Sequence, residues 1–360
     1  MMTEDVYRRL QNVLDTLPNG FPATDSGIEI KTLKKIFTPE EADLFCDLKL
    51  HFETAGQIAK RTGRPKAELK PLLTSMWHRG EILGAEVMGI RVYKMIPWIV
   101  GIYEFQVGRM DREFAAMCEE YEAYFKTQLI SHKPKLMQVV PVEKHIDTRQ
   151  QALSFQQVSA IIDSAKSFAI NECICTKGKK LLGEGCDKPK EICMALSKVP
   201  GVFKKHPWGR PITRNEAYET LRLAEEHGLV HLTSNVQTDH MFICNCCGCC
   251  CPVLDTLKGL GTAEHVNASF YAEIDADVCS GCGVCADERC QVDAIEADEE
   301  SFRVLQHRCI GCGLCVSTCP EEVIRLVQKP AEELEAPPVT QGDWMEARGK
   351  VRGIDFSALK

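Results

Sequence analysis

The sequence lacks the fingerprints of nucleotide-binding enzymes and of membrane proteins. It has no GxGxxG run after a predicted strand and no GxxxxGK run, so neither a dinucleotide site nor an ATP site is indicated. Its longest suspicious apolar stretch, residues 96–103, is far shorter than the ~20 residues that span a bilayer, and it contains Pro97. The chain opens Met-Met-Thr-Glu-Asp without an apolar signal segment. We therefore expect a cytoplasmic protein with no membrane anchor.

Cysteine, in contrast, is abundant. The 360 residues include 20 cysteines, and 44% of the residues are hydrophobic, which is enough for ordinary cores in two or three domains. So many cysteines in a short secreted chain would indicate disulfides. In a long chain without a signal segment they favour reduced, metal-binding thiolates.

Eight of the cysteines form two matching runs near the carboxyl end. The first run is Cys279, Cys282, Cys285 and Cys290, and the second is Cys309, Cys312, Cys315 and Cys319. A closely spaced triplet lets one loop hold three corners of a cubane, and in the bacterial run CxxCxxCxxxCP the fourth cysteine serves the other cluster. The runs therefore predict two [4Fe-4S] clusters, one held by Cys279, Cys282, Cys285 and Cys319 and the other by Cys309, Cys312, Cys315 and Cys290.

On these runs, residues 271–328 resemble a bacterial-type two-cluster ferredoxin, and the resemblance implies electron transfer. The first run departs from the family pattern, because four residues separate Cys285 from Cys290 and Gln291 stands where proline is usual. This departure bears on the solvent shielding and potential of one cluster. Paired zinc sites are the alternative, which the triplet spacing disfavours.

Ten more cysteines lie in the middle of the chain, in residues 173–193 and 244–251. Adjacent cysteines cannot all point into a core from one strand, because side chains alternate between its faces. We therefore predict a third iron–sulfur cluster, with zinc or a metal-free thiol site as the less favoured alternatives. The candidate ligands are Cys173, Cys175, Cys186, Cys193, Cys244, Cys246 and Cys247. Ten thiols would also suffice for two clusters.

The amino-terminal third has the pattern of three helices followed by a hairpin. Capping boxes begin at Thr38 and Thr54, a third helix is expected over 65–79, and strands are expected over 82–85 and 90–95. This order resembles the winged-helix family. Six Lys and Arg against one Glu in residues 54–80 favour DNA binding. Pro71 inside the third helix disfavours it, so we expect protein docking or dimerisation, with DNA binding as the alternative.

These elements predict an α+β multidomain protein. Its expected parts are a winged-helix-like domain (1–105), a helical connector (106–150), a Cys-rich α/β domain (151–265), a two-cluster ferredoxin domain (266–330) and a flexible tail (331–360) that Trp344 and Phe356 could anchor. One face of residues 110–129 is apolar, so this segment is expected to pack against the amino-terminal domain or to pair with a second copy in a homodimer. Overall, the order of modules resembles multidomain iron–sulfur proteins of anaerobic bacteria.

Charge is unevenly distributed along the chain, whose net charge is −8. Residues 271–330 contain twelve acidic and five basic side chains, whereas residues 177–214 contain ten basic and three acidic ones. The acidic segment predicts a redox partner with a basic surface, and the basic segment could dock the ferredoxin of its own chain, bind an anion or simply face solvent. We expect an electron carrier without a catalytic acid, base or nucleophile. The alternatives are a redox-sensing transcription regulator and an oxidoreductase component whose central cluster has an open coordination site.

Overall fold

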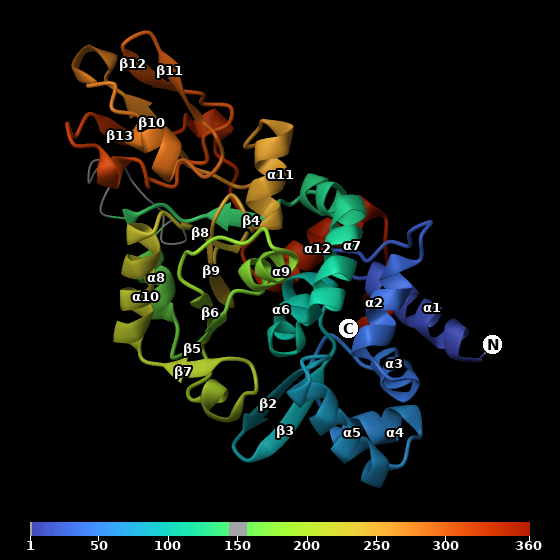
Figure 1. The fold of residues 1–360 in the computed structure, drawn as a ribbon. Helices are drawn as coiled ribbons and strands as arrows, with labels where there is room; N and C mark the ends of the chain where they lie inside the picture. Colours follow the sequence, from blue (N-terminus) through green and yellow to red (C-terminus); the bar gives the residue numbers. More distant parts are fainter. Residues whose placement is uncertain (1, 144–156) are drawn as a thin grey trace.

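The computed structural model describes residues 2–143 and 157–360. Figure 1 shows a helical amino-terminal region, a central sheet flanked by helices, and a carboxyl-terminal group of short strands at one end of the molecule. The expected boundary at 150/151 lies outside the described residues, and so does residue 155, where the pattern of residues 155–166 predicts that a helix begins. None of the described helices combines the length and apolar content needed to cross a bilayer.

The amino-terminal region begins with the helices α1 (Met2–Asp15), α2 (Ile28–Ile36), α3 (Pro39–Phe45), α4 (Ala55–Thr62) and α5 (Lys66–His78). A three-stranded antiparallel sheet has the order β1 (Glu53–Thr54), β3 (Ile90–Lys94) and β2 (Leu83–Val87). Both predicted capping boxes are confirmed, at Thr38 and Thr54. The expected helices and hairpin are present, while the likeness to a winged helix stays a prediction.

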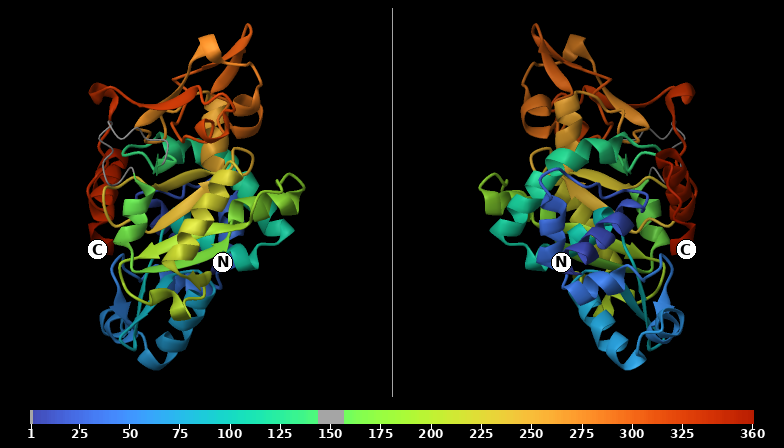
Figure 2. Two further views of the ribbon diagram at one scale, coloured as in Figure 1. Left: turned by 90° about the vertical axis from the view of Figure 1, so that its left-hand side faces the viewer. Right: turned by 90° about the vertical axis from the view of Figure 1, so that its right-hand side faces the viewer.

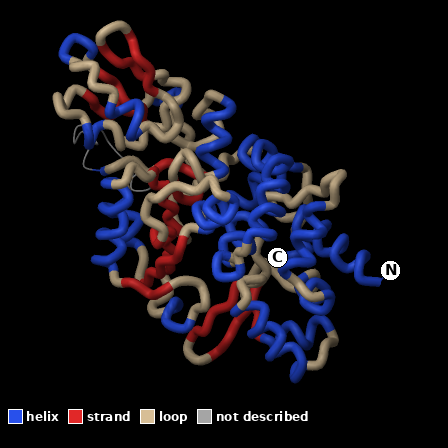
Figure 3. Tube along the Cα trace, viewed as in Figure 1, coloured by secondary structure: helices blue, strands red, loops and turns tan. Residues whose placement is uncertain are grey.

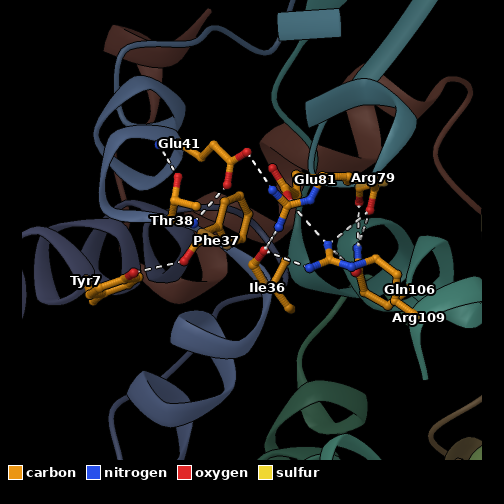
Figure 4. A network of polar contacts seen from close by, with 10 residues as sticks. Tyr7, Ile36, Phe37, Thr38, Glu41, Arg79, Glu81, Gln106 and Arg109 are labelled. Carbon is orange, nitrogen blue, oxygen red and sulfur yellow. Dashed lines mark hydrogen bonds and ion pairs between the residues drawn. The ribbon is translucent and has the colours of Figure 1, made fainter. Parts of the chain in front are cut away.

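Arginines of this region are engaged inside the protein. In Figure 4, Arg79 donates to the Glu41 carboxylate at 2.7 Å, and both Arg79 and Arg109 donate to the carbonyl oxygen of Ile36 and pair with the fully buried Glu81. Two more arginines of residues 54–80 are also paired, Arg61 with Glu53 and Arg64 with Asp43 and Asp47. Three of the six cations expected to favour DNA binding therefore hold the fold together.

A helical stretch leads from this region toward the centre of the molecule. It comprises η1 (Trp98–Ile102), α6 (Tyr103–Phe105), η2 (Val107–Arg109) and the long helix α7 (Arg112–Ser131). The predicted apolar face of α7 is largely confirmed, because Phe114, Cys118, Tyr121 and Phe125 are buried at helical spacing. Tyr124, which the helical spacing also assigns to that face, is an exception, because it is 54% exposed.

The central sheet has six strands in the order β4 (Met137–Val139), β8 (Val230–Ser234), β9 (Phe242–Cys246), β6 (Glu191–Ser197), β5 (Ser167–Glu172) and β7 (Arg210–Ile212). Every neighbouring pair is antiparallel, so the expected α/β class of this domain is corrected to helices packed on an antiparallel sheet. The helices α8 (Val158–Ser164) and α10 (Arg214–Glu226) share a core with one face, and α9 (Ile174–Leu182) lies toward α7 (Figures 1 and 3). A short turn, η5 (Val202–Lys205), precedes β7.

The carboxyl-terminal strands follow α11 (Pro252–Leu260) and project from the rest of the molecule (Figure 2). Two antiparallel pairs form, β10 (Phe270–Ile274) with β13 (Ile324–Gln328) and β11 (Ile295–Asp298) with β12 (Ser301–Val304). The short helices η6 (Ala276–Val278), η7 (Cys285–Arg289) and η8 (Val316–Thr318) connect them. Both β11 and β13 begin five residues after the fourth cysteine of a run, as an internal duplication predicts.

Residues 331–360 differ from the expected flexible tail. They form η9 (Ala331–Glu333), α12 (Gln341–Arg352) and η10 (Ser357–Leu359). Trp344 and Phe356 are buried, and the Trp344 indole N–H donates to the carbonyl oxygen of Lys135 at 2.9 Å. These two aromatic side chains therefore anchor residues 331–360, because they bury apolar surface against the rest of the protein.

Candidate metal centres

Four thiols from both ferredoxin-like runs line one cavity. Cys279, Cys282 and Cys285 line this cavity together with Cys319, which arrives from the second run just before β13. Apolar side chains such as Ile274 and Phe302 complete the lining. The sequence predicted this combination of three local thiols and one distant thiol. Their role as ligands stays a prediction.

The other four thiols of the runs also gather. Cys290 from the first run lies near Cys309 and Cys312, and burial raises the pKa of the Cys312 thiol to about 12. Backbone N–H groups donate to two of these sulfurs, from Ala272 to Cys309 Sγ at 3.4 Å and from Ala294 to Cys290 Sγ at 3.1 Å. Such donors stabilise negative charge on sulfur, as an iron–sulfur cluster requires. Cys315 also lies near Cys285, so the two groups of four adjoin.

Glycine is required where these loops turn around the thiols. Gly311 has a φ of +59°, and a Cβ there would lie 2.2 Å from the carbonyl oxygen of Phe270. Gly281, at the matching place of the first run, has a φ of +66°, and a Cβ there would lie 2.6 Å from the carbonyl oxygen of Glu300. Both positions combine a left-handed backbone with close approach, which only glycine tolerates.

The ten central thiols divide into two sets. Six of them, which we call the six-thiol chain, are neighbours in the order Cys175, Cys173, Cys193, Cys244, Cys246 and Cys251. The ladder between β6 and β9 pairs Met194 with Ile243, so the residues that continue it, Cys193 and Cys244, lie side by side. Alternation along β9 then places Cys246 on the same face as Cys244.

Two helices direct their amino termini at the six-thiol chain. Cys173 is the N-cap of α9 and Cys251 is the N-cap of α11. Hydrogen bonds from Cys175 and Cys193 hold the pKa of the Cys173 thiol well below its usual range, and bonds from Cys193 and Cys246 lower the pKa of Cys244 to about 5. Helix amino termini and thiol donors both favour negative charge on sulfur, so this place suits an anionic metal centre.

The remaining four thiols, Cys186, Cys247, Cys249 and Cys250, form a compact group that we call the four-thiol site. All four sulfurs lie within 4.8 Å of one another. Cys247 and Cys250 are buried, Cys186 is partly buried and Cys249 is exposed. A hydrogen bond from the Cys247 thiol lowers the pKa of Cys250 to about 5, and the backbone N–H of Cys186 also donates to that sulfur.

The predicted set of central ligands therefore mixes two places. Cys173, Cys175, Cys193, Cys244 and Cys246 belong to the six-thiol chain, whereas Cys186 and Cys247 belong to the four-thiol site. Cys249, Cys250 and Cys251 were missed. The alternation of side chains along the strand could have shown that Cys244 and Cys246 share one face and are distinct from the cysteines of the following loop. That this loop lies beside Cys186 depends on tertiary structure and could not be predicted. Cys173 follows β5, and Cys175 lies in the first turn of α9.

The comparisons with known proteins concern the carboxyl-terminal strands. Residues 272–326 match the model of the 4Fe-4S dicluster domain family, so this part of the chain is a ferredoxin-type iron–sulfur segment. No curated protein and no solved structure matches the chain.

Proposed function

We propose that this protein transfers electrons through two ferredoxin-type [4Fe-4S] clusters and one further cluster in its centre. The observation that carries the proposal is the convergence of Cys279, Cys282, Cys285 and Cys319 around one cavity, within a segment that matches the dicluster family. Clusters of this kind accept and release single electrons when bound. The work of the chain is to supply thiolates, to donate hydrogen bonds to sulfur and to exclude water.

The ligands that we propose for the ferredoxin-type clusters follow the predicted exchange of fourth cysteines. One set is Cys279, Cys282, Cys285 and Cys319, and the other is Cys309, Cys312, Cys315 and Cys290. The donors to the sulfurs of Cys290 and Cys309 support the second set. Because Cys315 lies near Cys285, the two sets adjoin, which favours rapid electron exchange between them.

For the further cluster we propose the six-thiol chain. It contains five of the seven predicted central ligands together with Cys251, and it lies against the amino termini of α9 and α11. A cubane needs only four thiolates, and thiols that are not adjacent within the six-thiol chain can occupy separate corners. The extended arrangement of these thiols therefore suits a polynuclear cluster better than a single ion.

Solvent contact distinguishes the two ferredoxin-type sets. Cys282 in the first set is exposed, whereas Cys309 and Cys315 in the second are buried. Asp287 lies next to the loop of the first set, and Glu321 lines its cavity. We propose that a redox partner with a basic surface docks at Cys282, since acidic side chains there would steer it.

Iron and acid-labile sulfide counts on anaerobically purified protein test the proposal. We expect about twelve irons per chain, from two ferredoxin-type cubanes and one central cubane. Cys246→Ser should lower the count by about four while the low-temperature EPR signals of the ferredoxin-type clusters remain. Cys46→Ser is the matched control, because Cys46 lies outside all thiol groups.

Two outcomes would contradict the proposal in different ways. A count near eight irons that Cys246→Ser leaves unchanged would refute the central cluster and leave the ferredoxin-type clusters supported. Colourless, iron-free protein would refute the whole proposal of electron transfer.

A further inference from the structure

The four-thiol site is more compact than any other group of potential metal ligands in the described residues. Three of its sulfur–sulfur distances, Cys186–Cys247, Cys186–Cys250 and Cys249–Cys250, are each 3.8 Å. No other set of three or more Cys, His or carboxylate ligand atoms within residues 2–143 and 157–360 converges within 4.8 Å. The thiols that line the ferredoxin-type cavity therefore stand farther apart than these four.

The spacing indicates how many metal ions fit. Four thiolates bind a single zinc ion tetrahedrally at about 2.3 Å, which places neighbouring sulfurs about 3.8 Å apart. Thiolates on a cubane are several ångströms more distant from one another, because four irons and four sulfides lie between them. The observed 3.8 Å separations match one tetrahedral ion and leave no room for a cubane.

The local sequence and burial agree with a single ion. Cys247 and Cys250 enclose Gly248 and Cys249, which is the two-residue spacing of zinc knuckles. Disulfides do not account for the group, since bonded sulfurs are about 2.05 Å apart and Cys186 here contacts two sulfurs at once. Cys247 and Cys250 also pack with the buried side chains of Ile192 and Leu229, so two ligands are held by the core.

We propose that Cys186, Cys247, Cys249 and Cys250 bind one Zn²⁺ ion, separately from every iron–sulfur cluster. The ion joins the loop between α9 and β6 to the loop after β9, and thiols that still carry protons release them as it binds. Gly248, inside the second loop, donates its N–H to the Gln291 side-chain oxygen at 2.9 Å, so the site also supports the contact with the ferredoxin-type segment. The proposal stands whether or not the protein transfers electrons.

The test uses the full chain, purified anaerobically from cells supplied with both zinc and iron. We expect one zinc per chain by mass spectrometry of metals, and a zinc X-ray absorption spectrum with four sulfur neighbours at about 2.3 Å. The double variant Cys186→Ala/Cys249→Ala removes the two less buried ligands and should lose nearly all zinc while iron and sulfide stay unchanged. Cys46→Ala is the control and should keep the zinc.

Several results would overturn the proposal. The proposal is wrong if the wild-type protein contains no zinc, or if its zinc is bound by nitrogen and oxygen atoms instead of sulfur. A double variant that keeps its zinc, or that loses iron instead, would assign the four thiols to another role. The wild-type spectrum decides by itself if the double variant fails to fold.

Discussion

At the scale of single residues, the buried imidazole of His240 predicts a pH-dependent stability. Its side chain is 9% exposed, and its Nδ1 lies 3.3 Å from the Thr233 hydroxyl oxygen. Burial lowers the pKa of His240 to about 4, below the ordinary value of 6.5. Between these values the unfolded chain binds the proton more tightly, so stability is full above pH 6.5 and falls as the pH drops toward 4.

His240→Gln should therefore flatten the pH dependence. The wild-type protein should lose up to about 3 kcal/mol between pH 7 and pH 4 through this group, and the variant should lose less. The measurement is the apparent thermal unfolding midpoint under anaerobic conditions at several pH values. His51→Gln, at an exposed histidine, should follow the wild type. Equal slopes for all three proteins would mean that His240 does not stay neutral in the fold.

Individual cysteines show what sequence can and cannot predict at this scale. The spacing of Cys279, Cys282 and Cys285 predicted a shared site, and these thiols line one cavity. Cys186 lies beside thiols about sixty residues along the chain, in a loop whose position depends on the sheet. Spacing encodes ligands that share a loop, whereas ligands from different loops meet only through tertiary packing.

At the scale of elements, α12 carries a buried charge that fastens the carboxyl end to the body. The Arg348 guanidinium is fully buried and donates to the carbonyl oxygens of Pro18 at 3.3 Å, His132 at 2.7 Å and Pro134 at 2.7 Å, and also to that of Leu129. One side chain thus joins α12 to the turn after α1 and to the end of α7.

Arg348→Met should weaken this attachment strongly. It leaves several buried carbonyl groups without a donor, and we expect a loss of about 3 kcal/mol. The apparent unfolding midpoint and protease resistance after residue 336 are the measurements. Arg325→Met is the control, because that side chain is 77% exposed and its pair with Glu273 contributes little. A midpoint equal to that of the control would show that α12 adds no stability.

The helices were predictable where their caps are local. The capping boxes at Thr38 and Thr54 begin helices as expected, and Thr213 with Glu216 forms the same motif at the start of α10. Thr340 and Asp343 form the same motif at the start of α12, and this signal was available in the sequence. The packing of α12 could not be predicted from the sequence. The partners of Arg348 are backbone carbonyl groups, which every residue has and which therefore leave no sequence pattern.

At the scale of the whole molecule, several polar contacts join the ferredoxin-type segment to the preceding central part of the chain. Arg289 donates to the Glu226 carbonyl oxygen at 2.8 Å, Ser317 donates to Glu225 at 2.9 Å, and Lys258 pairs with Asp293 at 3.3 Å. In the described part of the chain, no ion pair joins the basic residues 177–214 to this segment. Lys179, Lys180 and Arg210 pair instead with Glu119, Asp187 and Glu191, which supports the interpretation as a solvated surface.

A further contact is at Gly248, where the thiol-rich loop touches the residue after Cys290. A Cβ at Gly248 would lie 2.2 Å from the Gln291 carbonyl oxygen, which belongs to the backbone and cannot rotate away. Gln291 replaces the proline usual at this place, and its side chain accepts the Gly248 N–H at 2.9 Å. A proline there could not accept this bond. The departure from the ferredoxin pattern thus coincides with a contact between the ferredoxin-type segment and the thiol-rich loop.

Gly248→Ala should therefore loosen this contact between the thiol-rich loop and the ferredoxin-type segment. The added methyl group forces the loop or the segment after Cys290 to move, at a cost of about 1–3 kcal/mol. We expect faster hydrogen exchange at residues 226–228 and 289–291, while iron counts stay at the wild-type value. Gly259→Ala is the matched control, since a Cβ on that glycine of α11 meets nothing within 4 Å. If both variants exchange like the wild type, the ferredoxin-type segment is held in place elsewhere and the Gly248–Gln291 contact does not fix it.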